Sequence, residues 1–586
     1  MVESERRDCL FQTVVFFVSC ILVYRMELYL ENTLIFFFLT CVVVLGLTSV
    51  LMRERKFAVT GMDKIVLIYV IWKLFRYFHG LFPVDWFDVS VTVILYLFYL
   101  FARNTRGFSI GMSLFISGIL ITCWGFMQVM GILPSGHLFF RFTGCFSNPG
   151  ITGGYLALAI LGGIFQFGRI AGAKGKWWIL SGIFLLFAGL LFSRSRAAWI
   201  ALGSGWGWFV LSDGEYREAC NRFVRNNPVK TAWGIVLGLT GLFLLYIVRT
   251  DSVSARWLIW SVSFDIFQTS PWIGHGVHSF QALYMPFQAE WFKLHEGSGW
   301  EMIAGNNRYA FNEYVKIACE TGIIGLSLFL IPMVLLLRKT VNATVSVRFA
   351  GSVLLTFVVF CLFSYPFSIL LFRLILVVTV AFIVNEAGYE RREMVLPDLL
   401  RCGMLLFCGV MLFVVVWGTG VRREAESALK DIQSGTGVFP SFASSSEAFW
   451  LQSSPDFVLA YAYLLYHKGD GDESLFFLER AFRVCPSSEI TRDLGHIYRK
   501  GKRYEDAEEL LCLATHMTPA YVLPRYELFL LYREMCRNEE AVAMARKILT
   551  MPVKVVNTTV LRVRKEIKYF LLYETSSVNK ERRVPE

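Results

Sequence analysis

Long apolar stretches separated by short polar segments fill about the first 420 residues of the chain. A helix that crosses a membrane needs about 20 mostly apolar residues, and about thirteen stretches come close to that length. Two of them, 63–80 and 84–102, are weaker because Lys73, Arg76 and Asp88 interrupt them. The pattern predicts an all-α, polytopic helical membrane protein. The predicted spans are 10–25, 32–52, 63–80, 84–102, 108–130, 149–168, 177–193, 197–212, 231–249, 311–337, 348–365, 367–386 and 400–420.

Basic residues in the loops indicate how these spans are oriented. If the N-terminus is cytoplasmic, every loop predicted on that side is rich in Lys and Arg, as the positive-inside rule requires. The segment 131–148 and the long loop 250–310 then lie on the outer side of the membrane. Everything after about residue 421 lies there too, provided that 400–420 crosses the membrane.

The residues after the last predicted span are polar and have a helical period. Similar Tyr-containing segments recur in this region, and Pro486, Pro519 and Pro552 follow one another every 33 residues. This spacing resembles tetratricopeptide (TPR) repeats, helix pairs that stack because neither pair alone buries its apolar face. We therefore divide the chain into a transmembrane domain at 1–420 and a TPR-like α-solenoid domain at 421–586. An unrelated helical domain is the alternative.

Composition agrees with a membrane protein and argues against two other classes. The chain is 55% hydrophobic and 18% charged, whereas soluble domains have about 25% charged residues. The net charge of +11 is distributed over short loops between apolar spans, so it does not indicate nucleic-acid binding. The 13 cysteines form no CxxC pair, so we expect neither a disulfide framework nor a metal site.

Four arginines stand beside spans on the predicted outer side, where positive charge should be scarce: Arg141, Arg194, Arg196 and Arg256. Arginine near the hydrocarbon is costly, about 2.5–3.5 kcal/mol at a helix centre, so it usually meets an anion or a carboxylate. Ser195 is a candidate N-cap for the helix that follows, and a helix N-terminus also favours anions. Snorkelling interfacial arginines are the alternative.

Further polar residues cluster near these arginines in the sequence. Asn148 precedes a proline and demands a turn, and Trp260 shares a helical face with Arg256, four residues before it. His275 and His278 lie in a glycine-punctuated turn, where a loop hydrogen bond is the plainer role.

The entrance of the predicted span 311–337 is also polar. Asn312, Glu313, Lys316 and Glu320 indicate a water-filled pocket. Asn312, Lys316 and Glu320 are four residues apart on one face. A pair formed between Lys316 and Glu320 themselves is the alternative.

Taken in order, the segments 141–150, 192–199, 254–280 and 310–326 resemble the O-antigen ligase and polymerase superfamily of bacterial envelope glycosyltransferases. This superfamily also contains protein O-oligosaccharyltransferases, and the resemblance covers about residues 130–385. It implies a multi-pass inner-membrane enzyme that transfers a glycan from undecaprenyl diphosphate to an acceptor on the periplasmic face. It implies no cofactor. The acceptor is lipid A–core, a growing glycan or a protein.

The resemblance also implies roles for individual residues. Arg196 and Arg256 would engage the diphosphate of the carrier, with Arg194 as an additional candidate. Asn148, with Arg141 upstream, matches the Asn-Pro turn of the family, and Glu320 matches its Glu-x-Gly element. The chain departs from the family pattern at Phe311, where many ligases have the histidine that activates the acceptor hydroxyl. The base is therefore open among His275, His278, Glu313 and Glu320.

We predict a metal-independent, inverting glycosyltransferase of the O-antigen ligase type, with a polymerase or a protein O-oligosaccharyltransferase as alternatives. The predicted catalytic residues are Arg196, Arg256, Glu320 and His278. The predicted substrate-binding residues are Arg141, Asn148, Arg194, Trp260, His275, Asn312 and Glu313. The TPR-like domain would lie in the periplasm and dock a partner or the acceptor. A transporter or flippase is the rival class, for which we would expect internal repeats and helices broken at mid-membrane.

Overall fold

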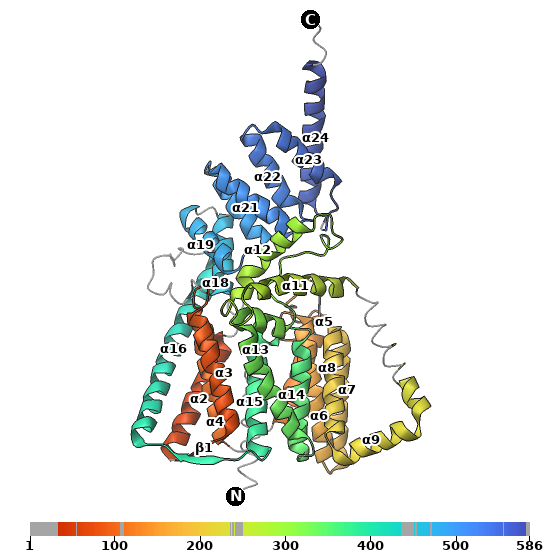
Figure 1. Cartoon of the computed structure of the whole chain (residues 1–586), viewed down its shortest axis with the longest axis vertical. Coiled ribbons are helices and arrows are strands. Elements are labelled where there is room, and N and C mark those ends of the chain that lie inside the picture. Colours follow the sequence, from red (N-terminus) through yellow and green to blue (C-terminus); the bar gives the residue numbers. More distant parts are fainter. Residues whose placement is uncertain are drawn as a thin grey trace.

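The computed structural model describes residues 33–53, 56–105, 110–137, 139–234, 236, 240, 250–434, 451, 454–468, 471–554 and 556–581. This part of the chain is almost entirely helical, as predicted, with one two-stranded sheet. The long helices up to residue 434 that are named next stand side by side as a bundle (Figure 1). They are α2 (Thr33–Arg53), α3 (Gly61–Phe78), α4 (Trp86–Asn104), α5 (Ile110–Val129), α6 (Pro149–Arg169), α7 (Ala173–Ser193), α8 (Arg196–Leu211), α13 (Glu313–Thr340), α14 (Val345–Cys361), α15 (Leu370–Glu386) and α16 (Asp398–Ser434).

Seven helices in the described residues are long and apolar enough to cross a membrane: α2, α4, α5, α6, α7, α13 and α16. The predicted count of thirteen is not confirmed. Helix α3 carries four charged residues, and α8, α14 and α15 have only 16 or 17 residues. The predicted span at 10–25 and most of the one at 231–249 lie outside the described residues.

Helix α6 forms the centre of the bundle, with 83% of its span buried. Small residues allow neighbouring backbones to approach it, because a Cβ at Gly162 would press against the carbonyl oxygen of Gly111 in α5. A hydrogen bond of 2.7 Å between Ser117 and Tyr155 joins the same two helices. This close packing holds α6 against α5, and the N-terminal end of α6 is part of the candidate site described below.

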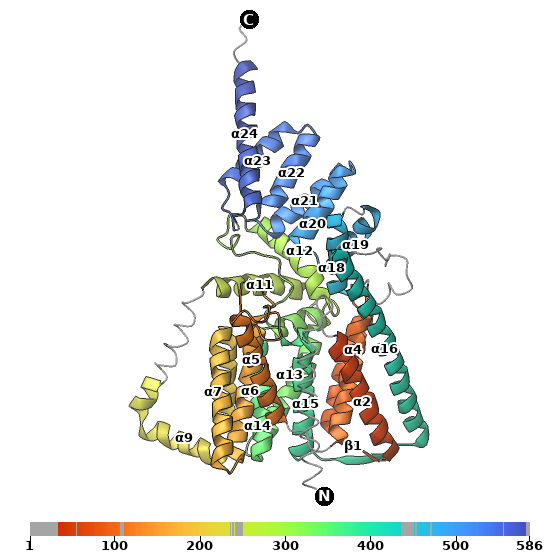
Figure 2. The same ribbon diagram turned by 180° about the vertical axis from the view of Figure 1, so that it is seen from behind.

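The two ends of the bundle are covered by different elements. Helix α11 (Thr250–Thr269) lies across one end, and α12 (Ser279–Leu294) rises from it (Figure 1). We call this end the α11 end. The antiparallel strands β1 (Lys56–Val59) and β2 (Arg392–Val395) lie at the opposite end, and α9 (Gly214–Asn226) projects from the other side of the bundle at this end (Figure 2).

Helix α13 is not the continuous span that we predicted at 311–337. Gly322 has φ 68° and ψ −174°, a conformation that breaks the helix. The rings of Tyr314 and Phe329 lie 6.3 Å apart, whereas 15 residues of straight helix would separate them by about 22 Å. The chain therefore folds back at Gly322, and the two halves of α13 face each other.

The loop 271–276 supplies the hydrogen bonds that this break removes. Backbone groups freed inside a membrane protein must find partners within the protein. The N–H groups of Ile323 and Ile324 donate to the carbonyls of Pro271 and Trp272, and those of His275 and Gly276 donate to Cys319 and Glu320. Trp72 of α3 donates to the carbonyl of Thr321 at 3.2 Å. Hydrogen bonds from α3 and from this loop therefore stabilise the break in α13.

The chain after α16 forms further helices above the α11 end (Figure 1). Consecutive helices pack as the pairs α18–α19, α20–α21 and α22–α23. Helix α16 runs through residue 420, so the predicted domain boundary lies inside a continuous helix. The assignment of these pairs to TPR repeats stays a prediction. The helices are α18 (Pro455–Lys468), α19 (Gly471–Val484), α20 (Ser488–Lys500), α21 (Tyr504–Met517), α22 (Val522–Glu534), α23 (Asn538–Thr550) and α24 (Thr558–Glu581).

Candidate functional site

Two polar neighbourhoods lie near the α11 end. The first, which we call the arginine site, is made by Arg196, Arg256, Phe311 and Tyr365. Arg196 is the first residue of α8, and Arg256 comes from α11. The Nη2 atom of Arg256 donates to the carbonyl of Phe363 at 3.3 Å, and its guanidinium lies 6.0 Å from the ring centre of Phe311. Arg256 and Phe311, which are 55 positions apart in the sequence, therefore lie close together.

The two arginines of this site influence each other electrostatically. Burial lowers the pKa of Arg256, and the positive charge of Arg196 lowers it further. Among the described residues, no carboxylate forms an ion pair with Arg256. A pair of neighbouring guanidinium groups with this environment favours an anion.

Aromatic rings form one wall of the arginine site. Tyr309 and Tyr365 stack with ring centres 4.0 Å apart, and Phe311 meets Tyr365 edge-on at 5.4 Å. The hydroxyl of Tyr365 accepts a hydrogen bond of 2.7 Å from the side-chain amide of Asn148. The same Asn148 caps α6 by accepting from Gly150 N–H. The wall therefore ties the start of α6 to the segments 309–312 and 363–367.

The remaining predicted residues near these arginines are either exposed or form structural hydrogen bonds. Arg141 lies in the loop before α6 and Arg194 ends α7 with φ 51°, and both side chains are exposed. Within the described part of the chain, neither side chain makes a hydrogen bond or an ion pair. Trp260 donates from Nε1 to the carbonyl of Ala310 at 3.1 Å, which fastens α11 to the aromatic wall. Asn312 is buried and uses its side chain to cap α13.

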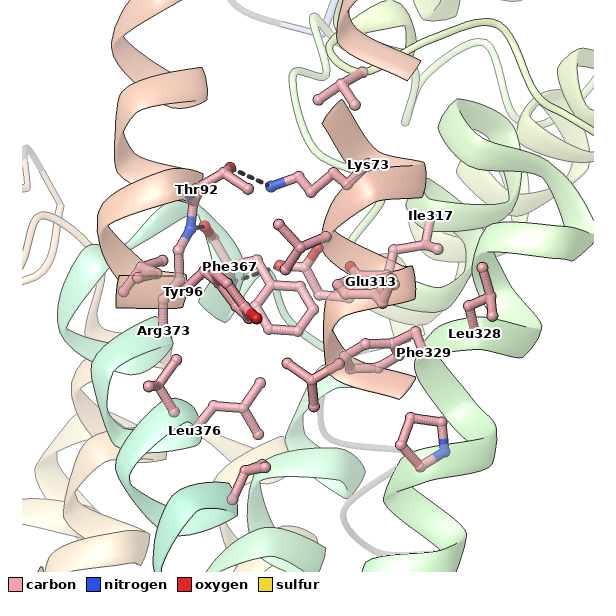
Figure 3. Close-up of a pocket in the computed structure, with 18 of the residues that line it drawn as sticks. Lys73, Thr92, Tyr96, Glu313, Ile317, Leu328, Phe329, Phe367, Arg373 and Leu376 are labelled. Carbon is pink, nitrogen blue, oxygen red and sulfur yellow. Dashed lines mark hydrogen bonds between the residues drawn. The ribbon is translucent and has the colours of Figure 1, made fainter. Parts of the chain in front are cut away.

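The second neighbourhood is a cavity of about 210 Å³ lined by α3, α4, α15 and both halves of α13. Figure 3 shows Lys73, Thr92, Glu313 and Arg373 converging on it, with Phe329 and other apolar side chains beyond them. The apolar part of the lining includes Ile317, Leu328, Phe329, Pro332, Met333, Leu376, Val377 and Val380. The cavity is polar at one end and apolar at the other.

Asp88 is the hub of the polar end. Its carboxylate lies 2.6 Å from Nη1 of Arg373 and 4.0 Å from Nζ of Lys73. It also accepts a hydrogen bond from the hydroxyl of Tyr77, and Nε2 of His278 lies 3.3 Å away. Lys73 donates in addition to Thr92 at 3.2 Å. The negative charge of Asp88 is therefore balanced by neighbouring basic side chains.

The polar residues at the start of α13 line the same cavity. Glu313 accepts a hydrogen bond of 2.7 Å from the backbone N–H of Phe367. Glu320 is 6% exposed, and its Oε1 atom has no hydrogen-bond partner among the described residues. The pair between Lys316 and Glu320 that we considered as an alternative does not form in the described structure. Both side chains are open to the cavity.

The two histidines of the turn before α12 differ in their surroundings. Nε2 of His275 lies 2.8 Å from the Thr269 hydroxyl and 3.1 Å from the carbonyl of Ile266, so this ring anchors the loop. His278 faces the cavity. Burial tends to lower the pKa of His278, but the nearby Asp88 carboxylate outweighs burial and raises it.

Sequence reasoning missed Lys73, Asp88 and Arg373 as site residues. The signal was present, because Lys73 and Asp88 are the charges that weakened two predicted spans, and Arg373 interrupts a third. A charged residue within a span is a candidate functional residue. No group of three or more His, Cys, Asp or Glu side chains that could hold a metal ion occurs in the described residues.

Comparison with known families finds a match for part of the chain. Residues 181–330 match the family model described as O-antigen ligase. The match begins within α7 and ends within α13, so it includes Arg196, Arg256, His278 and Glu320. This stretch of the chain is therefore similar to the O-antigen ligase family, a family of glycosyltransferase-like enzymes. A search of curated proteins found no match. The helices after α16 lie outside the matched residues.

Proposed function

We propose that the protein transfers a glycan from undecaprenyl diphosphate to an acceptor hydroxyl at the periplasmic face of the bacterial inner membrane, as an O-antigen ligase does. The observation that carries this proposal is the proximity of Arg196 and Arg256 at the α11 end of the bundle. Guanidinium groups match the oxygens of a diphosphate in geometry and charge. Both arginines lie within the residues that match the O-antigen ligase family.

The reaction exchanges one glycosidic bond for another. The acceptor oxygen forms a bond to the anomeric carbon, and the bond from that carbon to the diphosphate oxygen breaks. Negative charge grows on the leaving diphosphate, and Arg196 and Arg256 stabilise it in a site of low dielectric. The hydroxyl proton passes to Glu320 or His278, two of the candidate bases that line the cavity. This transfer is metal-independent, since the polyprenyl diphosphate is already a good leaving group.

Substitution of Arg256 tests the donor assignment. Transfer by purified Arg256→Ala protein should fall by about 100-fold or more, as when an oxyanion donor is removed. Arg222→Ala, on the exposed surface of α9, is the matched control and should keep full activity. Folding of both variants is checked by size-exclusion chromatography and thermal unfolding. Full transfer by a folded Arg256→Ala protein would refute the assignment.

A flippase is the second candidate, and the break in α13 is the observation that favours it, because broken helices also line transporter sites. The two functions separate in detergent solution. An enzyme still joins the glycan to its acceptor there, whereas a flippase has no membrane to act across. Loss of the protein from cells then identifies the acceptor by what accumulates: bare lipid A–core, short glycans or unglycosylated protein.

A further inference from the structure

The cavity and the arginine site differ in charge. The arginine site presents two guanidinium groups, and no carboxylate forms an ion pair with Arg256 in the described structure. Besides His278, the cavity is lined by three basic side chains and three acidic ones. A diphosphate would meet carboxylates there, and like charges in a partly buried site repel strongly. The cavity therefore suits a ligand without net charge. The basic residues are Lys73, Lys316 and Arg373, and the acidic ones are Asp88, Glu313 and Glu320.

The polar end of the cavity has unused hydrogen-bonding capacity. Asp88 is compensated within the protein, but Glu320 keeps one oxygen without a partner although the residue is only 6% exposed. Leaving a buried polar atom unpaired costs about 1–3 kcal/mol. Lys316, one helical turn away on α13, forms no ion pair in the described structure. A ligand with several hydroxyl groups supplies both the donor that Glu320 lacks and the acceptor that Lys316 lacks.

The rest of the lining is largely apolar, with the rings of Tyr69 and Tyr96 among it. Leu328 and Met333 from the second half of α13 and Leu376 and Val380 from α15 line this end of the cavity. In Figure 3, Phe329 lies between Leu328 and Leu376. This surface fits hydrocarbon. A ligand that satisfies both ends has a hydroxylated head and an apolar chain.

Two short segments connect the cavity to the arginine site. Phe311 belongs to the arginine site, and Glu313, two residues later, lines the cavity. Tyr365 and Phe367 stand in the same relation on the other segment, and the backbone N–H of Phe367 donates to Glu313. A molecule in the cavity is therefore next to the place where the diphosphate would lie.

We infer that the cavity is a second ligand site, separate from the arginine site, which binds the uncharged, hydroxyl-bearing head of a lipid-anchored saccharide. This inference rests on the proposed function in one respect: it makes that saccharide the acceptor. Glu320 and Lys316 bind its hydroxyl groups, and the apolar residues of α13 and α15 bind its hydrocarbon chain.

A photoreactive alkyl glucoside with a diazirine at the end of its chain tests the inference. The full-length protein is placed in phosphatidylcholine nanodiscs, labelled by illumination and mapped by mass spectrometry. We expect labels on α13 around 328–333 or on α15 around 376–380. An alkyl sulfate with the same chain should label these positions weakly, since its head is charged.

Two substitutions and one competitor decide the result. Leu328→Trp fills the apolar end and should reduce labelling about tenfold or more, since room for a few methylenes is removed. Ile331→Trp, on the exposed face of the same helix, should leave labelling unchanged. If Leu328→Trp does not fold, Val380→Phe fills the same space from α15. Excess undecaprenyl diphosphate should not compete with the glucoside.

Several results would overturn the inference. One is labelling that Leu328→Trp and Ile331→Trp reduce equally, another is labelling confined to the outer surface of the bundle, and a third is competition by undecaprenyl diphosphate. That last result would make the cavity part of the donor site. None of these results depends on transfer activity, so they are distinguishable from a failure of the Arg256 experiment.

Discussion

At the scale of single residues, the chain buries charged side chains within its helical bundle, where each needs a neighbour of opposite charge. Asp88 lies in the first turn of α4 and is in contact with groups from α3, α15 and the loop before α12. Arg373 is 285 residues away in the sequence, yet its Nη1 atom lies 2.6 Å from the Asp88 carboxylate. Removing one partner of such a pair leaves the other charge buried and alone.

Asp88→Asn should therefore destabilise the protein strongly, by about 3–5 kcal/mol, because Arg373 and Lys73 lose their carboxylate. The matched control is Asp398→Asn, which breaks a pair with Arg401 in which the Asp398 side chain is 70% exposed. That exposed pair should contribute at most about 1 kcal/mol. Thermal unfolding of both variants in detergent measures the difference. Equal melting temperatures for the two variants would contradict the role of Asp88.

His278 should make stability depend on pH. Asp88, and with it Asp85 and Glu320, favours the protonated ring, so the pKa of His278 is raised in the folded protein. The stabilisation by the charged ring is complete below its ordinary pKa of about 6.5 and is lost as the pH rises through the raised value.

The comparison is between wild type and His278→Gln from pH 5.5 to 8.5. The gap in melting temperature should be largest at the acid end and should shrink as the pH rises. His79→Gln, which removes an exposed imidazole, accounts for the general effect of losing a histidine. A gap that widens with pH would contradict the proposed contact with Asp88.

At the scale of elements, the break in α13 does most to shape the candidate site. A continuous helix at 313–340 would place Glu313 and Phe329 far apart, whereas the folded-back helix brings both to one cavity. The apolar pattern of the sequence predicted a span here but not its interruption. Gly322 was visible in the sequence as a glycine. The hydrogen bonds that stabilise the break there come from the loop 271–276, which lies about 50 residues earlier.

Gly322→Ala should destabilise this joint by about 1–3 kcal/mol, because residues other than glycine rarely adopt its backbone conformation. A Cβ at this position would also overlap the carbonyl oxygen of Trp272. Gly409→Ala is the matched control: Gly409 lies inside α16 with no neighbouring atom near the added Cβ. This control should be neutral or slightly stabilising. Thermal unfolding decides, and similar melting temperatures for both variants would contradict a strained turn.

At the scale of the whole molecule, the chain after α16 forms hydrogen bonds with α12 and with residues 303–306. The side-chain amide of Gln288 in α12 donates to the carbonyl of Met517, and Asn306 accepts from the backbone N–H of Ser488. Lys554 donates from Nζ to the carbonyls of Ile303 and Ala304 at 3.0 and 2.7 Å. The C-terminal helices therefore hold the segment that leads into the aromatic wall of the arginine site.

Lys554→Met should loosen this segment without unfolding the bundle. Hydrogen bonds from a charged donor contribute about 1.5–3 kcal/mol, so local opening near residues 303–307 should become measurably easier. Hydrogen exchange followed by mass spectrometry reports that opening. Lys547→Met, on the exposed face of α23, is the control and should not alter exchange there. Unchanged exchange in Lys554→Met would show that the contact does not restrain the loop.

The sequence by itself determined that the chain is helical and membrane-bound, since apolar length and helical period are local properties that each segment carries alone. It also singled out Arg196, Arg256, His278, Glu313 and Glu320, because charge beside or within an apolar stretch stands out without a structure. Only the tertiary structure decided which of these residues meet. It joined the two arginines, placed Glu313 and Glu320 with Asp88 and Arg373 around one cavity, and gave Asn312, Trp260 and His275 structural roles. The physical reason is that pairing across helices depends on packing and on a break at one glycine, and neither is encoded in the periodicity of any single segment.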